Sequence, residues 1–432
     1  MFKKKLQRLL SSEINSKIFS YGTWILFGNL FSKAVFLLAT IIIAHFLGKE
    51  EYGQFGIIKS TILMFSMFAG IELGITATKF ISQYRKTDKE KVEKIVGLSN
   101  FLAIMLSLLC TVIVFIFART IAVLINAPNL YTEIRISAFI LFFASLNGVQ
   151  GGILSGLEKF KELSINNAIA GTFSSLAIIA AAKFFGLDMV IIAFGLNYFL
   201  MFLLNFITLR KEFYSDFKVS VFNKKNFDES KVLWTFSLPA VLAGLMVTPT
   251  IWICNYFLVN SPNGYAEMAN FDVANQWRNT ILFIPVALSQ IALPMLASKV
   301  EDKSEYKAIF SKNLKINFFI GFAMVLVFCL ISPVILRLYG VKYSNALLPL
   351  IIMFISTGLI SVNNVIGQAI ASQGKMWLGF YVNLLWGTIL MALSYILIVK
   401  FDLGAFGLAI AYLVSYSVHT VVQFFYISKF IR

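Results

Sequence analysis

Apolar stretches of twenty or more residues follow one another along almost the whole 432-residue chain, and this feature limits the fold more than any other. Each stretch can cross a bilayer as a helix, which needs roughly 20 residues. Inside lipid the backbone polar groups have no water to bond, so only helices and closed barrels span it. Barrel strands alternate polar and apolar residues, and these runs do not alternate. The sequence therefore predicts an all-α integral membrane protein.

Twelve transmembrane helices are expected from the hydropathy pattern. The predicted spans are 18–47, 53–82, 95–118, 132–156, 165–185, 188–209, 233–259, 266–297, 313–337, 345–370, 378–400 and 405–428. The second and eighth are long enough to require tilt or a break. The basic start MFKKKLQRLL precedes an apolar segment that is too long for a signal sequence, so we expect a retained first helix.

The 37 Lys and Arg residues predict the orientation of the chain in the membrane. Loops on one side, together with both chain ends, hold 26 of them, and the opposite loops hold six. Cytoplasmic loops carry the excess of basic residues, so both termini are expected in the cytoplasm, on the inner side of the cell membrane. The net charge of +16 then reflects topology. A nucleic-acid partner is not expected, because the charges lie in short loops between spans.

A repeat at half the chain length suggests two related halves. The stretch SLNGVQG at 145–151 resembles SVNNVIG at 361–367, with an offset of 216 residues. Polar identities continue along this offset, and they are not what a shared apolar composition produces. The alternative is coincidence among membrane helices of biased composition.

Six spans per half place both halves in the membrane with the same orientation. Such repeats form two bundles that meet at a central interface, where transporters bind substrate. We therefore predict two pseudo-symmetric six-helix bundles around a central cavity, formed by residues 1–209 and 233–432 and joined by a cytoplasmic linker at 210–232. Because the other loops are short, a membrane glycan polymerase or ligase with a large catalytic loop is a weaker alternative.

Charged residues inside the spans are candidates for the functional site, because a charge at mid-bilayer costs about 2.5–3.5 kcal/mol. The set comprises Lys33, Lys59, Lys79, Arg135, Arg278, Glu72 and Asp272. Lys33 and Arg278 are the deepest, roughly 22 and 18 Å from the start of their spans. Lys59, Arg135 and Asp272 are expected nearer the outer ends, where basic side chains can also reach the interface. Glu72 and Lys79 share a helix face, as a structural pair or as part of an ion-coupling site.

The eighth span carries a polar stripe in the stretch NFDVANQWRNT. Asp272, Gln276 and Asn279 follow one another at spacings of four and three, with Asn275 and Arg278 beside them. Such a stripe lines a cavity or forms helix–helix hydrogen bonds. With five cations and two anions in the spans, a cavity would favour an anionic substrate such as a pyrophosphate.

Motifs for cofactors, metals and covalent catalysis are not found in the sequence. The three cysteines fall within spans, and the two histidines are far apart. Neither a phosphate-binding loop of the type GxxxxGK[ST] nor an HExxH motif occurs. We therefore expect no catalytic residue, no metal and no cofactor.

Three stretches resemble the polysaccharide transporter family, which belongs to the multidrug/oligosaccharidyl-lipid/polysaccharide flippase superfamily. They are LGKEEYGQFG at 47–56, GITATKFISQYR at 74–85 and GGILSGLEKFKE at 151–162. The resemblance is strongest to flippases of O-antigen and capsule repeat units. It implies two six-helix bundles around a cavity and translocation of undecaprenyl-pyrophosphate-linked oligosaccharide across the inner membrane.

The resemblance also implies partners and alternatives. The partners are the lipid-linked oligosaccharide and membrane lipids, while a glycan polymerase and coupling to H+ or Na+ stay open. A cation-coupled multidrug extruder of the same superfamily is the main alternative, with Glu72 and Asp272 as ion-coupling candidates. Lipid II flippases of the superfamily have two further helices that this sequence does not supply. For Lys33 and Arg278, replacement by alanine is expected to impair glycan export, and replacement by glutamate to impair it more.

Overall fold

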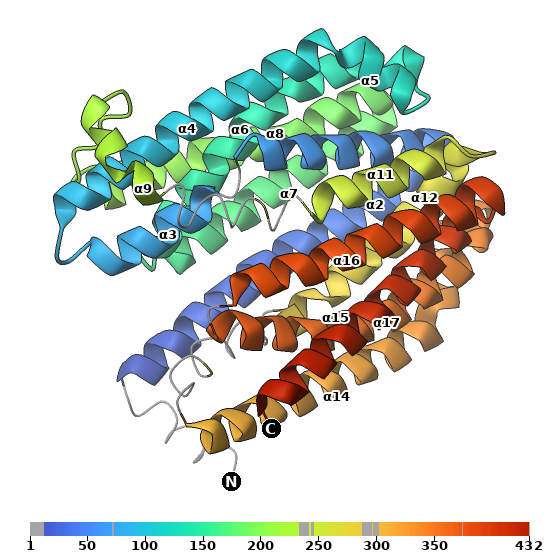
Figure 1. The fold of residues 1–432 in the computed structure, drawn as a ribbon. Helices are drawn as coiled ribbons and strands as arrows, with labels where there is room; N and C mark the ends of the chain where they lie inside the picture. Colours follow the sequence, from blue (N-terminus) through green and yellow to red (C-terminus); the bar gives the residue numbers. More distant parts are fainter. Residues whose placement is uncertain are drawn as a thin grey trace.

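The computed structural model describes residues 13–70, 73–232, 246–286, 302–373 and 375–431, together with Leu242 and Leu296 (Figure 1). Throughout this part of the chain the regular structure is helical, and it contains no strand. This confirms the predicted all-α class.

The first helix group comes from the N-terminal half. It comprises α2 (Glu13–Phe68), α3 (Leu73–Tyr84), α4 (Lys89–Ile116), α5 (Ala118–Leu124), α6 (Tyr131–Gly156), α7 (Phe160–Phe184) and α8 (Leu187–Glu212). Within the group, α6 packs against α3, α4 and α8, and α7 packs against α2 and α8. After α8 the chain forms η2 (Lys224–Glu229), which packs on α4, and the single turn α9 (Ser230–Val232).

The second helix group comes from the C-terminal half. It comprises α11 (Thr248–Val259), α12 (Gly264–Ile281), α14 (Lys303–Arg337), η4 (Val341–Ala346), α15 (Leu347–Ser372), α16 (Met376–Ser394), the π-helical turn η5 (Tyr395–Lys400) and α17 (Gly404–Ile431). Here α15 packs against α14, α17 and α12, and α16 packs against α17. The two groups meet where α2 packs against α11 and α12.

Nine helices of the described residues are long and apolar enough to cross a membrane. They confirm a multi-pass membrane protein. The stretch Leu30–Phe68 counts once among the nine, although it bends within its length. The predicted spans 233–259 and 266–297 lie partly outside the described residues, and α11 and α12 cover the remainder. A total of twelve in two symmetric bundles therefore stays a prediction.

The predicted second span, 53–82, differs from the observed helices. The helical segment after Gly48 ends at Phe68, and a separate helix, α3, begins at Leu73. Gly70 between them has φ of 90°, a conformation that glycine adopts without steric cost. The stretch therefore forms two helices where the sequence predicts one tilted or broken span.

A kink at Gly48 divides α2 into two arms. Gly48 has φ of 77° and ψ of 177°, which a residue with a Cβ atom rarely adopts. The chain therefore reverses there, and the second arm runs back alongside α11 and α12 (Figure 1). We call the end of the molecule that contains Gly48 the kink end. The opposite end, where α2 begins and α17 finishes, is the terminal end.

Candidate functional site

A polar cavity of about 340 Å³ lies between the two helix groups. Its walls come from the second arm of α2, from α11 and from α12. Five residues predicted from sequence line it: Lys59, Asp272, Asn275, Arg278 and Asn279. Four of them, Asp272, Asn275, Arg278 and Asn279, come from one face of α12, whereas Gln276 of the predicted stripe is not part of the lining.

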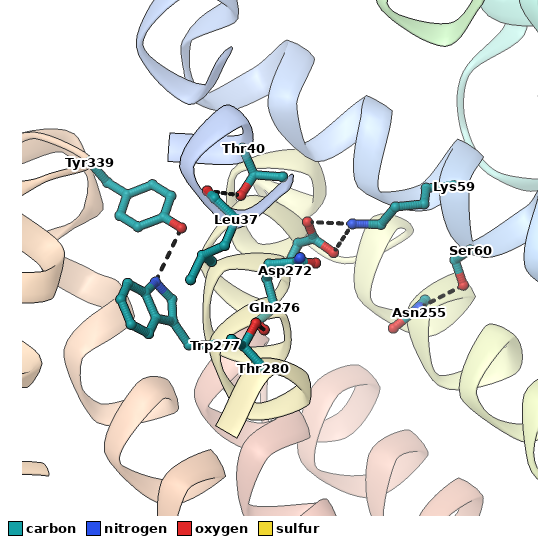
Figure 2. A network of polar contacts seen from close by, with 10 residues as sticks. All are labelled: Leu37, Thr40, Lys59, Ser60, Asn255, Asp272, Gln276, Trp277, Thr280 and Tyr339. Carbon is teal, nitrogen blue, oxygen red and sulfur yellow. Dashed lines mark hydrogen bonds and ion pairs between the residues drawn. The ribbon is translucent and has the colours of Figure 1, made fainter. Parts of the chain in front are cut away.

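An ion pair between the two helix groups forms one wall of the cavity. The Lys59 ammonium lies 2.9 and 2.8 Å from the two carboxylate oxygens of Asp272 (Figure 2). The side chains are only 12% and 3% exposed, so water screens the pair weakly. Lys59 is eleven residues beyond Gly48, or about 16 Å along the helix.

Arg278 brings a second cation to the cavity. Its side chain is buried, and its Nη2 donates to Oδ1 of Asn279 at 3.3 Å. The guanidinium carbon lies 5.0 Å from the centre of the Tyr412 ring. The other two nitrogens, Nε and Nη1, are buried without a hydrogen-bond partner. A buried guanidinium with two unused donors is suited to bind an anion.

Two polar residues of the cavity were not predicted. Nδ2 of Asn255 on α11 donates to the Ser60 hydroxyl at 2.9 Å, and both residues line the cavity (Figure 2). Asn255 stands alone within the apolar run of α11. A lone amide in a membrane span is a signal that could have identified it. Ser60 carries no such signal, because a serine hydroxyl can bond within its own helix.

The remaining predicted site residues that the structure describes do not line this cavity. Lys33 is exposed, with its ammonium 4.8 Å from the centre of the Phe283 ring. Arg135 lies over Phe115 and Tyr131 at the start of α6, within the first helix group. Gln276 does not line the cavity. Glu72 lies outside the described residues, so its predicted pairing with Lys79 is not tested.

The side-chain hydrogen bonds that join the two groups gather toward the kink end. Nε2 of His45 contacts the Leu338 carbonyl at 2.6 Å, close to Gly48. Asn260 donates to the Leu124 carbonyl, and Tyr265 donates to the Ile125 carbonyl. The other connections lie at the cavity: Asn255 to Ser60, Trp252 to Thr61, and the ion pair. These connections therefore run from the cavity to the kink end.

A cavity with two cations, one carboxylate and several amides, placed between two groups of membrane helices, is typical of a transporter for an anionic substrate. Sequence comparison identifies the family. Residues 42–348, well over half of the chain, match the family described as polysaccharide biosynthesis protein. The chain belongs to this family. Named relatives and solved structures are also similar to this chain.

Two relatives are transport proteins by name. The EPS I polysaccharide export inner membrane protein EpsE of Ralstonia solanacearum is 29% identical over 196 residues, which is 44% of each chain. The match therefore spans less than half of EpsE. The putative O-antigen transporter of Escherichia coli K12 is 25% identical over 339 residues, 77% of this chain and 78% of the relative.

Solved structures share the fold. An inward-facing multidrug resistance transporter of the MATE family superposes with a TM-score of 0.74 at 18% identity, covering 92% of this chain and 94% of that one. The lipid II flippase MurJ, in an inward closed conformation, also gives 0.74, at 16% identity over 94% of this chain and 87% of its own. This member of the polysaccharide biosynthesis family thus has the fold of that transporter superfamily.

Proposed function

We propose that this protein is a flippase that moves an undecaprenyl-pyrophosphate-linked oligosaccharide from the cytoplasmic to the outer leaflet of the inner membrane. The cavity between the helix groups carries this proposal. It combines Lys59 and Arg278 with Asp272, for a net charge of plus one, between helices of the two groups. The diphosphate is the part of such a lipid that is most costly to move through hydrocarbon. Cations in a cavity between the membrane helices would offset this cost.

The mechanism that fits this cavity is alternating access. In the proposal, the two groups are six-helix bundles, the terminal end faces the cytoplasm, and the kink end faces outward. The hydrogen bonds toward the kink end hold that side closed. The substrate enters from the terminal end, and rocking of the bundles then exposes the cavity on the outer side. Lys33 faces Phe283 of the other group on the entry side of the cavity, where it would attract the diphosphate.

The competing function, a cation extruder, gains less from this arrangement. An extruder of cationic drugs needs a carboxylate that is free to bind the drug or the coupling ion. Asp272 is the carboxylate of this cavity, and both of its oxygens contact Lys59. The neighbouring Arg278 adds positive charge, which repels a cationic drug.

The test is a flipping assay with purified protein in liposomes. The probe is a fluorescent undecaprenyl-pyrophosphate sugar, and dithionite added outside quenches only the outer leaflet. Without the protein about half of the probe should stay protected, whereas the protein should make nearly all of it accessible. The Lys59→Gln/Arg278→Gln variant should lose this activity, because the diphosphate has lost both cations. If the native protein does not flip the probe but makes a sensitive strain resistant to drugs, the flippase proposal is wrong and the protein is an extruder.

A further inference from the structure

The ion pair between Lys59 and Asp272 differs from the other ion pairs of the described residues because it joins the two helix groups. The pair of Arg85 and Glu158 lies within the first group, and that of Lys94 and Asp228 joins α4 to the segment after α8. Lys59 lies on α2 and Asp272 on α12, and both line the cavity (Figure 2). A ligand in the cavity therefore touches the connection between the groups directly.

The two cations of the cavity differ in how far they are already neutralised. Asp272 already neutralises Lys59, whereas the Nε and Nη1 groups of Arg278 have no partner. A headgroup with one negative charge can be balanced by Arg278 alone, and it leaves the ion pair intact. A diphosphate carries at least two negative charges, so it can balance both cations and replace Asp272 at Lys59.

The Asp272 carboxylate has a second hydrogen-bond donor beside it. The Tyr52 hydroxyl lies within reach of the Asp272 carboxylate and has no other hydrogen-bond partner. Tyr52 is fully buried, so its hydroxyl gains a partner if the carboxylate turns toward it. When a diphosphate is present, Asp272 can therefore leave Lys59 and both charges keep a partner: Lys59 pairs with the diphosphate, and Asp272 accepts from Tyr52.

We propose that Asp272 determines substrate specificity, because it makes opening of the kink end conditional on a headgroup with at least two negative charges. This inference rests on the proposed flippase function and extends it. Phosphatidylglycerol and other lipids with a single phosphate charge enter the cavity without breaking the ion pair, so they are not carried across. A diphosphate lipid displaces Asp272, separates α2 from α12 and is carried across.

The test compares the native protein with Asp272→Asn in liposomes that contain fluorescent phosphatidylglycerol. The native protein should leave this lipid in place. In Asp272→Asn the groups are no longer held by opposite charges, so the rate of phosphatidylglycerol flipping should rise at least tenfold. The charge-exchanged variant Lys59→Asp/Asp272→Lys restores an ion pair and should suppress the leak again.

Two controls separate the ion pair from general loosening. Trp252→Phe removes the hydrogen bond from Trp252 to Thr61, which also joins the groups but carries no charge. Glu158→Gln breaks the ion pair with Arg85 inside the first group. Glu158→Gln should leave phosphatidylglycerol flipping at the native level, and Trp252→Phe should raise it by no more than about fivefold, the effect of one neutral hydrogen bond. A leak of equal size in Trp252→Phe would overturn the proposal.

A distance measurement tests opening without any transport. Spin labels at Val123 and Val341, exposed positions near the kink end in different groups, report their separation, with the partly exposed Cys329 replaced by serine. The labels should move apart in ligand-free Asp272→Asn and come together again in the charge-exchanged variant. Unchanged distances in a folded Asp272→Asn would refute the inference. If the labels separate as expected but the native protein does not flip the pyrophosphate lipid, the flippase proposal fails and the role of the ion pair stands.

Discussion

Replacement of Arg278 by glutamate is expected to abolish export of the lipid-linked glycan while the protein still reaches the membrane. Arg278 lines the cavity with two unpartnered donors, and a phosphate group would satisfy both. Hydrogen bonds to charged groups contribute about 1.5–3 kcal/mol each, so loss of this anchor should weaken diphosphate binding by roughly a hundredfold. Glutamate adds repulsion, because its carboxylate would share the cavity with Asp272 and with the phosphates.

The measurement is binding of farnesyl pyrophosphate to the purified protein, together with surface glycan in cells. Arg278→Lys keeps the charge but loses the planar fork, so it should fall between the native protein and glutamate. Arg135→Gln is the matched control, because Arg135 is also a cation within a membrane span but lies over Phe115 and Tyr131 instead of in the cavity. Equal losses in Arg135→Gln and Arg278→Glu would mean that membrane insertion, and not the cavity, is responsible.

The second large effect is expected at Gly152, where α6 touches the backbone of α3. A Cβ atom at Gly152 would lie 2.1 Å from the Gly74 carbonyl oxygen, and one at Gly74 would lie 2.1 Å from that of Gly148. Membrane helices that lack large side chains at a crossing pack through such close contacts. Gly152→Leu must therefore push α3 away from α6 and break the bond from the Thr78 hydroxyl to the Gly152 carbonyl. We expect a loss of about 1–3 kcal/mol in the free energy of unfolding.

The neighbouring glycine supplies the control for this prediction. A Cβ atom at Gly151 would meet no atom within 4 Å. Gly151→Leu has the same effect on helix propensity, so the difference between the two variants isolates the contact with α3. Thermal stability in detergent and protein level in the membrane should fall for Gly152→Leu and stay near native for Gly151→Leu. Similar losses in both would show that this contact does not stabilise the fold.

Much of the fold could be predicted from local sequence. A membrane helix requires a run of about twenty apolar residues, and such a run is visible in the sequence without knowledge of tertiary contacts. The polar character of α12 was also readable, but the stripe was predicted as Asp272, Gln276 and Asn279, whereas Asn275 and Arg278 line the cavity and Gln276 does not. The length of the second span predicted tilt or a break, but it did not give the position of the break after Phe68.

The partner of Asp272 could not be predicted from spacing. Lys59 precedes it by 213 residues, and their contact depends on the packing of α2 against α12. Arg135 shows the opposite case, where a charge in a span packs on aromatic rings and has no place in the cavity.

The links between the helix groups have a consequence for the resting protein. Five hydrogen bonds and one ion pair join the groups by side chains in the described residues. At about 1 kcal/mol each, they favour the closed arrangement by on the order of 6 kcal/mol. In the empty protein, about one molecule in 10⁴ would then be in the opposite arrangement at equilibrium. In the proposed flippase this bias would make idle turnover rare, so that lipids stay in their own leaflets while the cavity is empty.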